Sequence, residues 1–220
     1  MLDFSSTAGD NLVVTFEGVD QSSTLLFYHS YGVIELSNTK KGGMLSFQIP
    51  SLLSQYAGTF RYELIAGQTP LRKGNIIIKS SVASDLETYC GPKHILVGGE
   101  DFSMLTSLIL DELDNPIPNT TDLSAQVGGN IISKPMDSSV LINYTKIFSP
   151  KKRGNGAVAA KFGDLASQEF RLEFYANQPE DYQIAVEKQH EYADGIQLVS
   201  ITSSTIRDQY GNNRNTKVNF

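Results

Sequence analysis

The stretch GTFRYELIAG, residues 58–67, alternates apolar and polar side chains with a period of two. Phe60, Tyr62 and Leu64 fall on one face of an extended chain, whereas Arg61 and Glu63 fall on the other. This alternation predicts an antiparallel strand that packs one face on a core and exposes the other to water. A glycine at each end of the run is typical of a short strand.

Most other segments have the same strand-like character. Short runs rich in β-branched and aromatic residues predict strands at 11–18, 23–30, 43–50, 74–81, 102–110 and 170–175. A single helical turn is expected within 51–58, and no apolar stripe of helical period continues over a long segment. We therefore predict an all-β fold.

The composition narrows the possible functions. The chain has 220 residues and a net charge of −6, without the extended basic face expected of a nucleic-acid-binding protein. Cys90 is the sole cysteine, so an internal disulfide and a thiolate metal cluster are excluded. Because no apolar run reaches 18 residues, we expect no direct membrane insertion. The N-terminus lacks the features of a signal peptide, which suits a cytoplasmic protein or an excised piece of a longer one.

The stretch DELDNPIPNT, residues 111–120, could form a metal site, a catalytic carboxylate pair or a tight turn. It lies in a repeat, because residues 94–115 align with residues 191–212 at an offset of 97. The identical pairs are Gly98 and Gly195, Ser103 and Ser200, Ser107 and Ser204, Ile109 and Ile206, Asp111 and Asp208, and Asn115 and Asn212.

The repeat favours the turn. Gly211 stands where Asp114 stands, so a second carboxylate is not part of the repeated pattern and a general acid/base pair is not expected. Asp side chains accept bonds from backbone N–H groups two residues on, and Asn tolerates a positive φ. Weak calcium binding at Asp111, Asp114 or Asp208 stays open at this stage.

The repeated pattern resembles the bacterial immunoglobulin-like domains of invasin and intimin surface proteins. The resemblance rests on Asp111, Asp114, Asn115 and Pro116, and again on Asp208, Gly211 and Asn212. It covers parts of the second and third units. The first unit shares none of it and is more similar to a generic macroglobulin or fibronectin sandwich. The family implies tandem rods that present or space a binding tip, and it implies no catalytic residues.

We therefore predict tandem immunoglobulin-like β-sandwiches, the last one incomplete. The predicted domains are residues 1–82, 83–177 and a partial unit at 178–220, since the offset of 97 is close to the ~100 residues of one such sandwich. The partial unit is expected to pair with the second unit, with another chain or with a missing domain portion. Its last residues, NTKVNF at 215–220, have the character of an edge strand open to strand addition.

A few polar groups are candidates for binding. Lys151, Lys152 and Arg153 form a basic cluster in SPKKRGNG, predicted to be a hairpin tip that is either a solvated loop or a contact for an acidic partner or anionic glycan. The histidines at positions 29, 94 and 190 fall in different units and are expected to be exposed or at strand edges. We expect no metal, no cofactor and no catalytic residue.

The function predicted from these features is a non-catalytic structural or adhesive spacer of a bacterial surface, periplasmic or secreted protein, which binds an unknown protein or glycan through loops or an edge strand. One alternative is an accessory module of a larger secretion or polysaccharide-acting assembly, possibly glycan-binding. An enzyme whose site is built from residues distant in sequence is the other.

Overall fold

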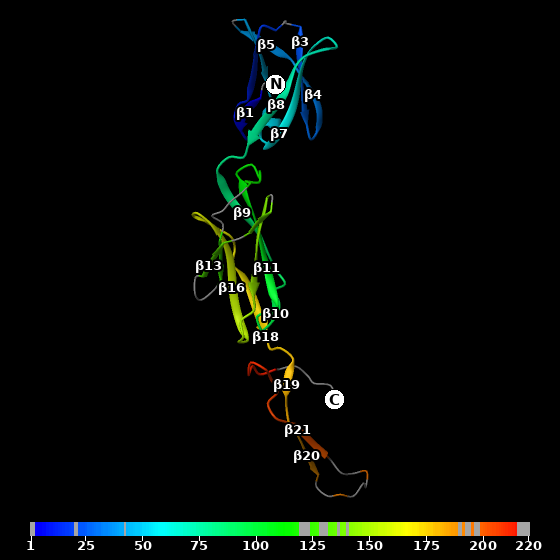
Figure 1. Cartoon of the computed structure of the whole chain (residues 1–220), viewed down its shortest axis with the longest axis vertical. Helices are drawn as coiled ribbons and strands as arrows, with labels where there is room; N and C mark the ends of the chain where they lie inside the picture. The colour runs from blue at the N-terminus through cyan, green and yellow to red at the C-terminus, as the bar shows by residue number, and fades with distance from the viewer. Residues whose placement is uncertain are drawn as a thin grey trace. The chain divides into compact units, whose positions relative to one another are not determined.

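The computed structural model describes residues 3–19, 22–41, 43–118, 124–127, 132–135, 137–139, 141–188, 191, 195 and 199–214. Strands make up most of these residues (Figure 1). The chain divides into two compact units. The first comprises Met1–Glu87 with Leu108–Thr120, and the second comprises Thr88–Ser107 with Thr121–Phe220.

The first unit contains two sheets and one helical turn. The larger sheet has the order β1 (Phe4–Thr7), β8 (Thr69–Lys79), β7 (Gly58–Ala66), β3 (Ser23–His29) and β4 (Gly32–Leu36). The smaller sheet has the order β2 (Val13–Glu17), β6 (Met44–Gln48) and β5 (Asn38–Lys41), and α1 (Ser51–Ser54) is the single turn expected from the sequence. Strand β1 runs parallel to β8, while the other pairs of both sheets are antiparallel.

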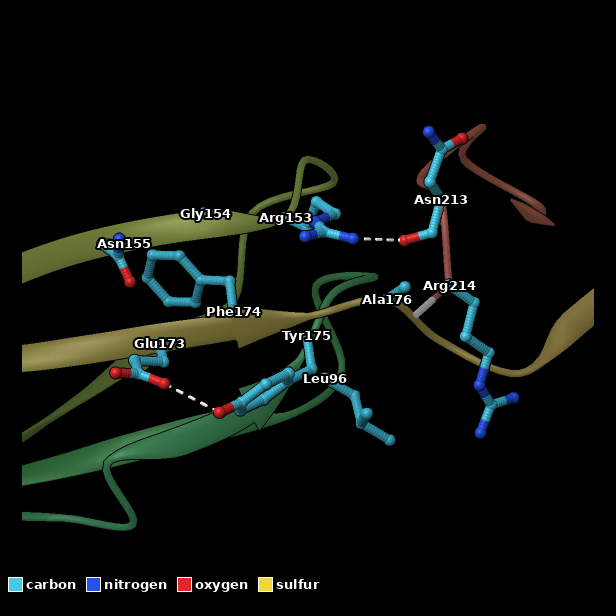
Figure 2. Close-up of a pocket in the computed structure, with 10 residues that line it drawn as sticks. All are labelled: Leu96, Arg153, Gly154, Asn155, Glu173, Phe174, Tyr175, Ala176, Asn213 and Arg214. Atoms are coloured by element: carbon cyan, nitrogen blue, oxygen red, sulfur yellow. Dashed lines mark hydrogen bonds between the residues drawn. The ribbon is translucent and has the colours of Figure 1, made fainter. Parts of the chain in front are cut away.

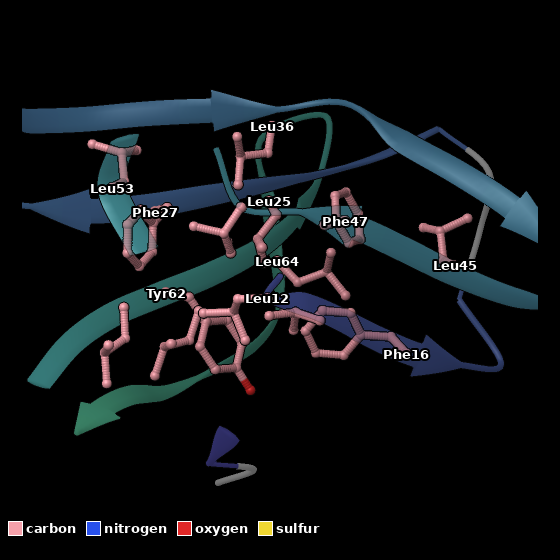
Figure 3. Packing of buried hydrophobic residues seen from close by; sticks show 14 of the residues in the cluster. Leu12, Phe16, Leu25, Phe27, Leu36, Leu45, Phe47, Leu53, Tyr62 and Leu64 are labelled. Carbon is pink, nitrogen blue, oxygen red and sulfur yellow. The ribbon is translucent and has the colours of Figure 1, made fainter. Parts of the chain in front are cut away.

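The core of the first unit lies between these sheets (Figure 3). Phe16 and Phe47 come from the smaller sheet, and Phe27, Tyr62 and Leu64 come from the larger one; all are buried. The rings of Phe16 and Tyr62 lie 5.6 Å apart between centroids. The alternation in residues 58–67 therefore predicts the buried face of β7 correctly, because burial of the apolar face drives the two sheets together.

The second unit also contains two principal sheets. The first has the order β10 (His94–Leu96), β18 (Phe170–Tyr175), β16 (Gly154–Phe162), β12 (Ser124–Val127) and β13 (Ile132–Pro135), with β17 (Leu165–Ala166) paired to β16. The second has the order β14 (Asp137–Ser139), β15 (Ile142–Phe148), β11 (Phe102–Asp111) and β9 (Ala83–Gly91). Buried side chains from both sheets include Ile95, Leu105, Ile147, Val158 and Leu172.

The described strands within residues 178–214 form two-stranded pairs. Strand β19 (Pro179–Asp181) pairs with β22 (Arg207–Asp208), and β20 (Ile184–Lys188) pairs with β21 (Val199–Ser203). All residues of strands β20 and β21 are exposed. The prediction of an all-β fold whose last sandwich is incomplete is thereby confirmed, whereas the edge strand expected at 215–220 lies outside the described residues.

Residues 108–118 pack in the first unit, although the sequence repeat assigns them to the second domain. Strand β11 accordingly begins among residues of the second unit and ends among residues of the first. The domain boundaries at 82/83 and 177/178 stay a prediction. Within the described ranges, no helix combines the length and apolarity needed to cross a lipid bilayer.

Candidate functional site

The end of strand β11 carries a buried carboxylate that is surrounded by N–H donors. Asp111 is 1% exposed. Its Oδ1 accepts bonds from the backbone N–H groups of Leu113 and Asn115, both at 2.9 Å, and its Oδ2 accepts from the N–H of Ser81 at 2.9 Å. The amide Nδ2 of Asn115 donates to both carboxylate oxygens, at 3.2 and 3.1 Å.

Asn115 in turn binds the chain between α1 and β7. Its Oδ1 accepts a bond from the N–H of Ala57 at 2.7 Å, and its Nδ2 donates to the carbonyl oxygen of Gln55 at 2.8 Å. The side chains of Asp111 and Asn115 therefore connect three separate segments of the first unit through hydrogen bonds to backbone groups. We call Asp111 and Asn115, and the equivalent Asp208 and Asn212, the Asp–Asn pairs.

The second pair repeats the first at an offset of 97 residues. Asp208 Oδ1 accepts from the N–H groups of Tyr210 and Asn212, both at 2.9 Å, and Oδ2 accepts from the N–H of Asn177 at 2.9 Å. The Asn212 amide donates to both oxygens of Asp208, at 3.1 and 3.0 Å. The sequence repeat thus corresponds to the same set of hydrogen bonds in each unit.

The turn interpretation of these carboxylates is confirmed, with one difference. The bond from the N–H group two residues on is present in both pairs. The residue with a positive φ precedes the Asn: Asp114 has φ 61° and Gly211 has φ 77°. This explains why a glycine replaces a carboxylate at this position, since a left-handed backbone favours Gly and tolerates Asp.

The surroundings of the two carboxylates keep them ionised. Burial alone would raise the pKa of Asp111, but the donors from Ser81 and Asn115 outweigh it and hold the pKa below its ordinary value. The pKa of Asp208 is lowered in the same way, with Asn212 as the main donor against the effect of burial. Because N–H groups already point at these oxygens, the pairs have the chemistry of structural hydrogen-bond centres. No group of three or more His, Cys, Asp or Glu that could hold a metal occurs in the described part of the chain.

The predicted basic loop adjoins the second Asp–Asn pair. Lys151, Lys152 and Arg153 lie between β15 and β16, and their side chains are exposed. The prediction of a hairpin tip is wrong, because β15 and β16 belong to different sheets and the loop crosses between them. Its backbone is held by Asn212, whose Nδ2 donates to the carbonyl of Lys151 and whose Oδ1 accepts from the N–H of Arg153, both at 2.9 Å.

Arg153 also lines a pocket of about 510 Å³ in the second unit, drawn in Figure 2. The Arg153 guanidinium donates to the carbonyl oxygen of Asn213, and Arg207 Nε donates to the Asn213 side-chain oxygen at 3.2 Å. Arg214 follows directly and donates to Gln178 Oε1 at 3.0 Å. The residues that line the pocket are Leu96, Arg153, Gly154, Asn155, Glu173, Phe174, Tyr175, Ala176, Asn213 and Arg214.

The lining of the pocket also contains the ring of Tyr175 and the carboxylate of Glu173, which has hydrogen-bond and ion-pair partners. Tyr175 is 48% exposed, and its hydroxyl donates to Glu173 Oε2 at 2.7 Å (Figure 2). His94 Nε2 lies 3.6 Å from the same oxygen, and Arg171 Nε lies 3.9 Å from Oε1. The bond from Tyr175, helped by the charges of His94 and Arg171, keeps the pKa of Glu173 below its ordinary value although burial opposes this.

The sequence pointed to one residue of this pocket, Arg153, through the basic cluster. Arg214, Tyr175 and Leu96 also line the pocket, but they carry no local motif and come from distant segments. The repeat could have pointed to residues 213–214, because they directly follow the repeated Asn212.

His29, His94 and Cys90 belong neither to the Asp–Asn pairs nor to the lining of the pocket. His29 is buried on β3, an inner strand of its sheet, contrary to the expectation that it is exposed or at a strand edge. Its ring stacks on Phe60 at 4.6 Å between ring centroids. His94 is exposed on β10, as predicted, whereas residue 190 lies outside the described residues. Cys90 lies in β9 with its Sγ 3.2 Å from the Ser103 hydroxyl, and burial raises the pKa of its thiol.

Comparisons with known proteins identify the fold. No family model matches the chain, and no curated protein matches it by sequence. Its structure is similar to that of FdeC, an Escherichia coli adhesin, with a TM-score of 0.65, 15% identity and coverage of 93% of this chain and 71% of that one.

Two further solved structures support the same fold. InvD of Yersinia pseudotuberculosis has a TM-score of 0.56 and 14% identity, with coverage of 96% of this chain and 69% of that one. Invasin, a bacterial integrin-binding protein, has a TM-score of 0.52 and 14% identity, with coverage of 97% of this chain and 46% of that one. The chain therefore has the fold of the immunoglobulin-like domains of bacterial adhesins, as the Asp–Asn turn pattern predicts.

Proposed function

We propose that the chain is a non-catalytic structural and adhesive module of a bacterial surface or secreted protein. The observation that carries this proposal is the duplication of the Asp–Asn pair at an offset of 97 residues, with equivalent hydrogen bonds in both units. Repetition of a buried hydrogen-bond centre suits a protein assembled from successive similar domains, in which each repeat contributes stability.

The solved structures with this fold support the adhesive part of the proposal. FdeC is an adhesin and invasin is an integrin-binding protein. The sequence identities are near 15%, so the property that this chain shares with these proteins is the fold. Ligand binding in such modules is carried by loops on a stable scaffold, and the loop at 151–153 is held to its scaffold by Asn212.

The chemistry of the carboxylates supports a non-catalytic role. Asp111 and Asp208 are occupied by N–H donors, so neither has a proton to give nor a lone pair directed at a substrate. Glu173 is the one carboxylate among the lining residues of the pocket at Arg153. The described lining residues therefore include no second carboxylate to form a general acid/base pair with Glu173.

A second function, as a component of a larger assembly, is favoured by the β20–β21 hairpin. Its register places Val186 opposite Ile201, so both lie on one face, and they are 53% and 61% exposed. An apolar face of this kind is commonly covered by another part of an assembly.

Size-exclusion chromatography with light scattering separates the two functions. A spacer module is expected to elute as a monomer over a wide concentration range. A stable oligomer that becomes monomeric in the double variant Val186→Ser/Ile201→Ser would contradict the spacer and support the assembly component. The matched control is Ala185→Ser/Thr202→Ser, which changes a pair on the other face of the same hairpin.

A further inference from the structure

We propose that the pocket of the second unit binds an anionic saccharide, with separate anionic groups at Arg153 and at Arg214 and a sugar ring against Tyr175. This inference names the ligand class for the adhesive function proposed above and rests on it. The pocket has a volume of about 510 Å³, which lies within the usual range of roughly 300–1,000 Å³ for small-ligand sites.

Positive charge gathers at one side of this pocket. Arg153 and Arg207 both donate to Asn213, and Arg214 is the next residue. Lys151 and Lys152 adjoin Arg153 in the exposed loop. Five cationic residues therefore lie in the loop before β16 and around Asn213, with Asp181 paired opposite Arg207, in a chain whose net charge is −6. Cations gathered in this way attract an anion.

The arginines have donors suited to a sulfate or carboxylate. A guanidinium presents five N–H groups in a planar fork that can bind two oxygens at once. The bond from Arg153 to Asn213 uses one of these groups and orients the rest of the fork. Further, the backbone of Arg153 is fixed by the bond of its N–H to Asn212, so little ordering of the loop is needed on binding.

The carboxylate in the pocket does not cancel this attraction. Glu173 accepts the Tyr175 hydroxyl, and its two oxygens lie 3.6 Å from His94 and 3.9 Å from Arg171. These partners lie on β10 and β18, whereas Arg153 comes from the loop before β16 and Arg214 from the segment after β22. Both signs of charge are thus present, with two arginines and one carboxylate among the lining residues of the pocket.

The remaining wall favours a saccharide over an acidic peptide. Tyr175 and Leu96 are 48% and 43% exposed, and they give an apolar surface on which a sugar ring can stack. Asn155 and Asn213 supply side-chain amides for hydroxyl groups. Phe174 also lines the pocket, and its ring packs so closely on β16 that a Cβ at Gly156 would lie 2.9 Å from it.

Binding is tested by titration calorimetry on the full chain with four probes. These are a heparin-derived tetrasaccharide, 3′-sialyllactose, lactose and a hexaglutamate peptide. We expect binding of at least one of the two anionic saccharides, at least tenfold weaker binding of lactose and of the peptide, and weakening by added salt. The two saccharides distinguish sulfate from carboxylate as the preferred group.

Variants assign the binding to the pocket. Arg153→Ala and Arg214→Ala are each expected to weaken saccharide binding about tenfold, because each removes charge-assisted hydrogen bonds to an anionic group. Tyr175→Ala should weaken it about fivefold or more, whereas Tyr175→Phe, which keeps the ring, should stay within about twofold. The control is Lys161→Ala, an exposed cation on β16 six residues from Asn155 and about 20 Å along the strand.

Circular dichroism checks that each variant is folded. Equal binding of the peptide and the saccharides, or an equal loss with Lys161→Ala and Arg153→Ala, would overturn the proposal. Absence of saccharide binding by the folded wild-type chain would also overturn it. That last result would leave the structural module standing, because the oligomeric state tests that function separately.

Discussion

Asn115 donates its side-chain amide to both oxygens of Asp111, at 3.2 and 3.1 Å, and its backbone N–H to Oδ1 at 2.9 Å. The two residues are four apart in the sequence and both are buried. The pair therefore acts as a single hydrogen-bonded unit whose members depend on each other, and Asp208 and Asn212 repeat it.

Asp111→Ala is expected to destabilise the first unit by roughly 3 kcal/mol, because three backbone N–H groups and the Asn115 amide lose a charged acceptor in a buried place. Urea unfolding followed by circular dichroism measures the change. Glu112→Ala is the control, because Glu112 is exposed in the same turn and its loss should shift stability by less than about 0.5 kcal/mol. Equal unfolding midpoints for the two variants would contradict the structural role of the carboxylate.

Substitutions at Asp114 should follow the backbone conformation of the turn. Asp114→Gly is expected to be neutral within about 1 kcal/mol, since Gly211 has the same left-handed conformation in the second pair. Asp114→Val should cost more than about 1 kcal/mol, because a β-branched side chain clashes at φ 61°. Thermal unfolding of both variants measures the difference, and a valine variant as stable as the glycine variant would be inconsistent with this turn.

Acid should weaken both units through the Asp–Asn pairs. The pKa values of Asp111 and Asp208 are lowered in the folded chain from the ordinary value of 3.8, so their stabilisation is complete above that value. It is lost as the pH falls through the lower folded pKa values, because protonation removes the charged acceptor. Urea midpoints measured at pH 7, 4 and 2.5 test this.

The matched variant for the acid experiment is Asp111→Asn/Asp208→Asn. It should be less stable than the wild type at pH 7 and should show a smaller decline below pH 4. A decline as steep as that of the wild type would show that other groups carry the acid sensitivity.

His29 should add a second pH dependence, in the first unit alone. Its Nδ1 accepts the N–H of Tyr31 at 3.4 Å, while its Nε2 is buried with no hydrogen-bond partner among the described residues. Burial lowers the pKa of His29 from 6.5, so the neutral ring stabilises the unit above pH 6.5 and this contribution is lost as the pH falls toward the folded pKa.

His29→Phe removes the titrating group and keeps an aromatic ring against Phe60. The variant should unfold with nearly the same midpoint at pH 7.5 and pH 5.5, whereas the wild type should be less stable at pH 5.5. A pH dependence identical to that of the wild type would exclude His29 as its source. Tyr56→Phe is a suitable control, because it alters the same cluster without changing a group that titrates in this range.

The sequence predicted the strands and turns that depend on residues close together in the chain. The alternation of Tyr62 and Leu64 with polar neighbours predicts a strand and its buried face, and both are present. The repeat of Asp111 and Asp208 predicts a turn, because the Asx hydrogen bonds join residues two to four apart. The burial of His29 could not be predicted in this way, since it depends on Phe60 and Tyr56 from other segments.

The sequence by itself determined that the chain is built of sandwiched strands and that one Asp–Asn turn recurs after 97 residues, because side-chain period and Asx hydrogen bonding depend on a few neighbouring positions. Only the tertiary structure decided that residues 108–118 pack in the first unit and that Arg153, Tyr175 and Arg214 line one pocket. These arrangements arise from hydrogen bonds and packing between residues far apart in the chain, such as Asn115 with Ala57 and Asn212 with Arg153. No pattern along the sequence records which distant backbone groups a buried amide will bind.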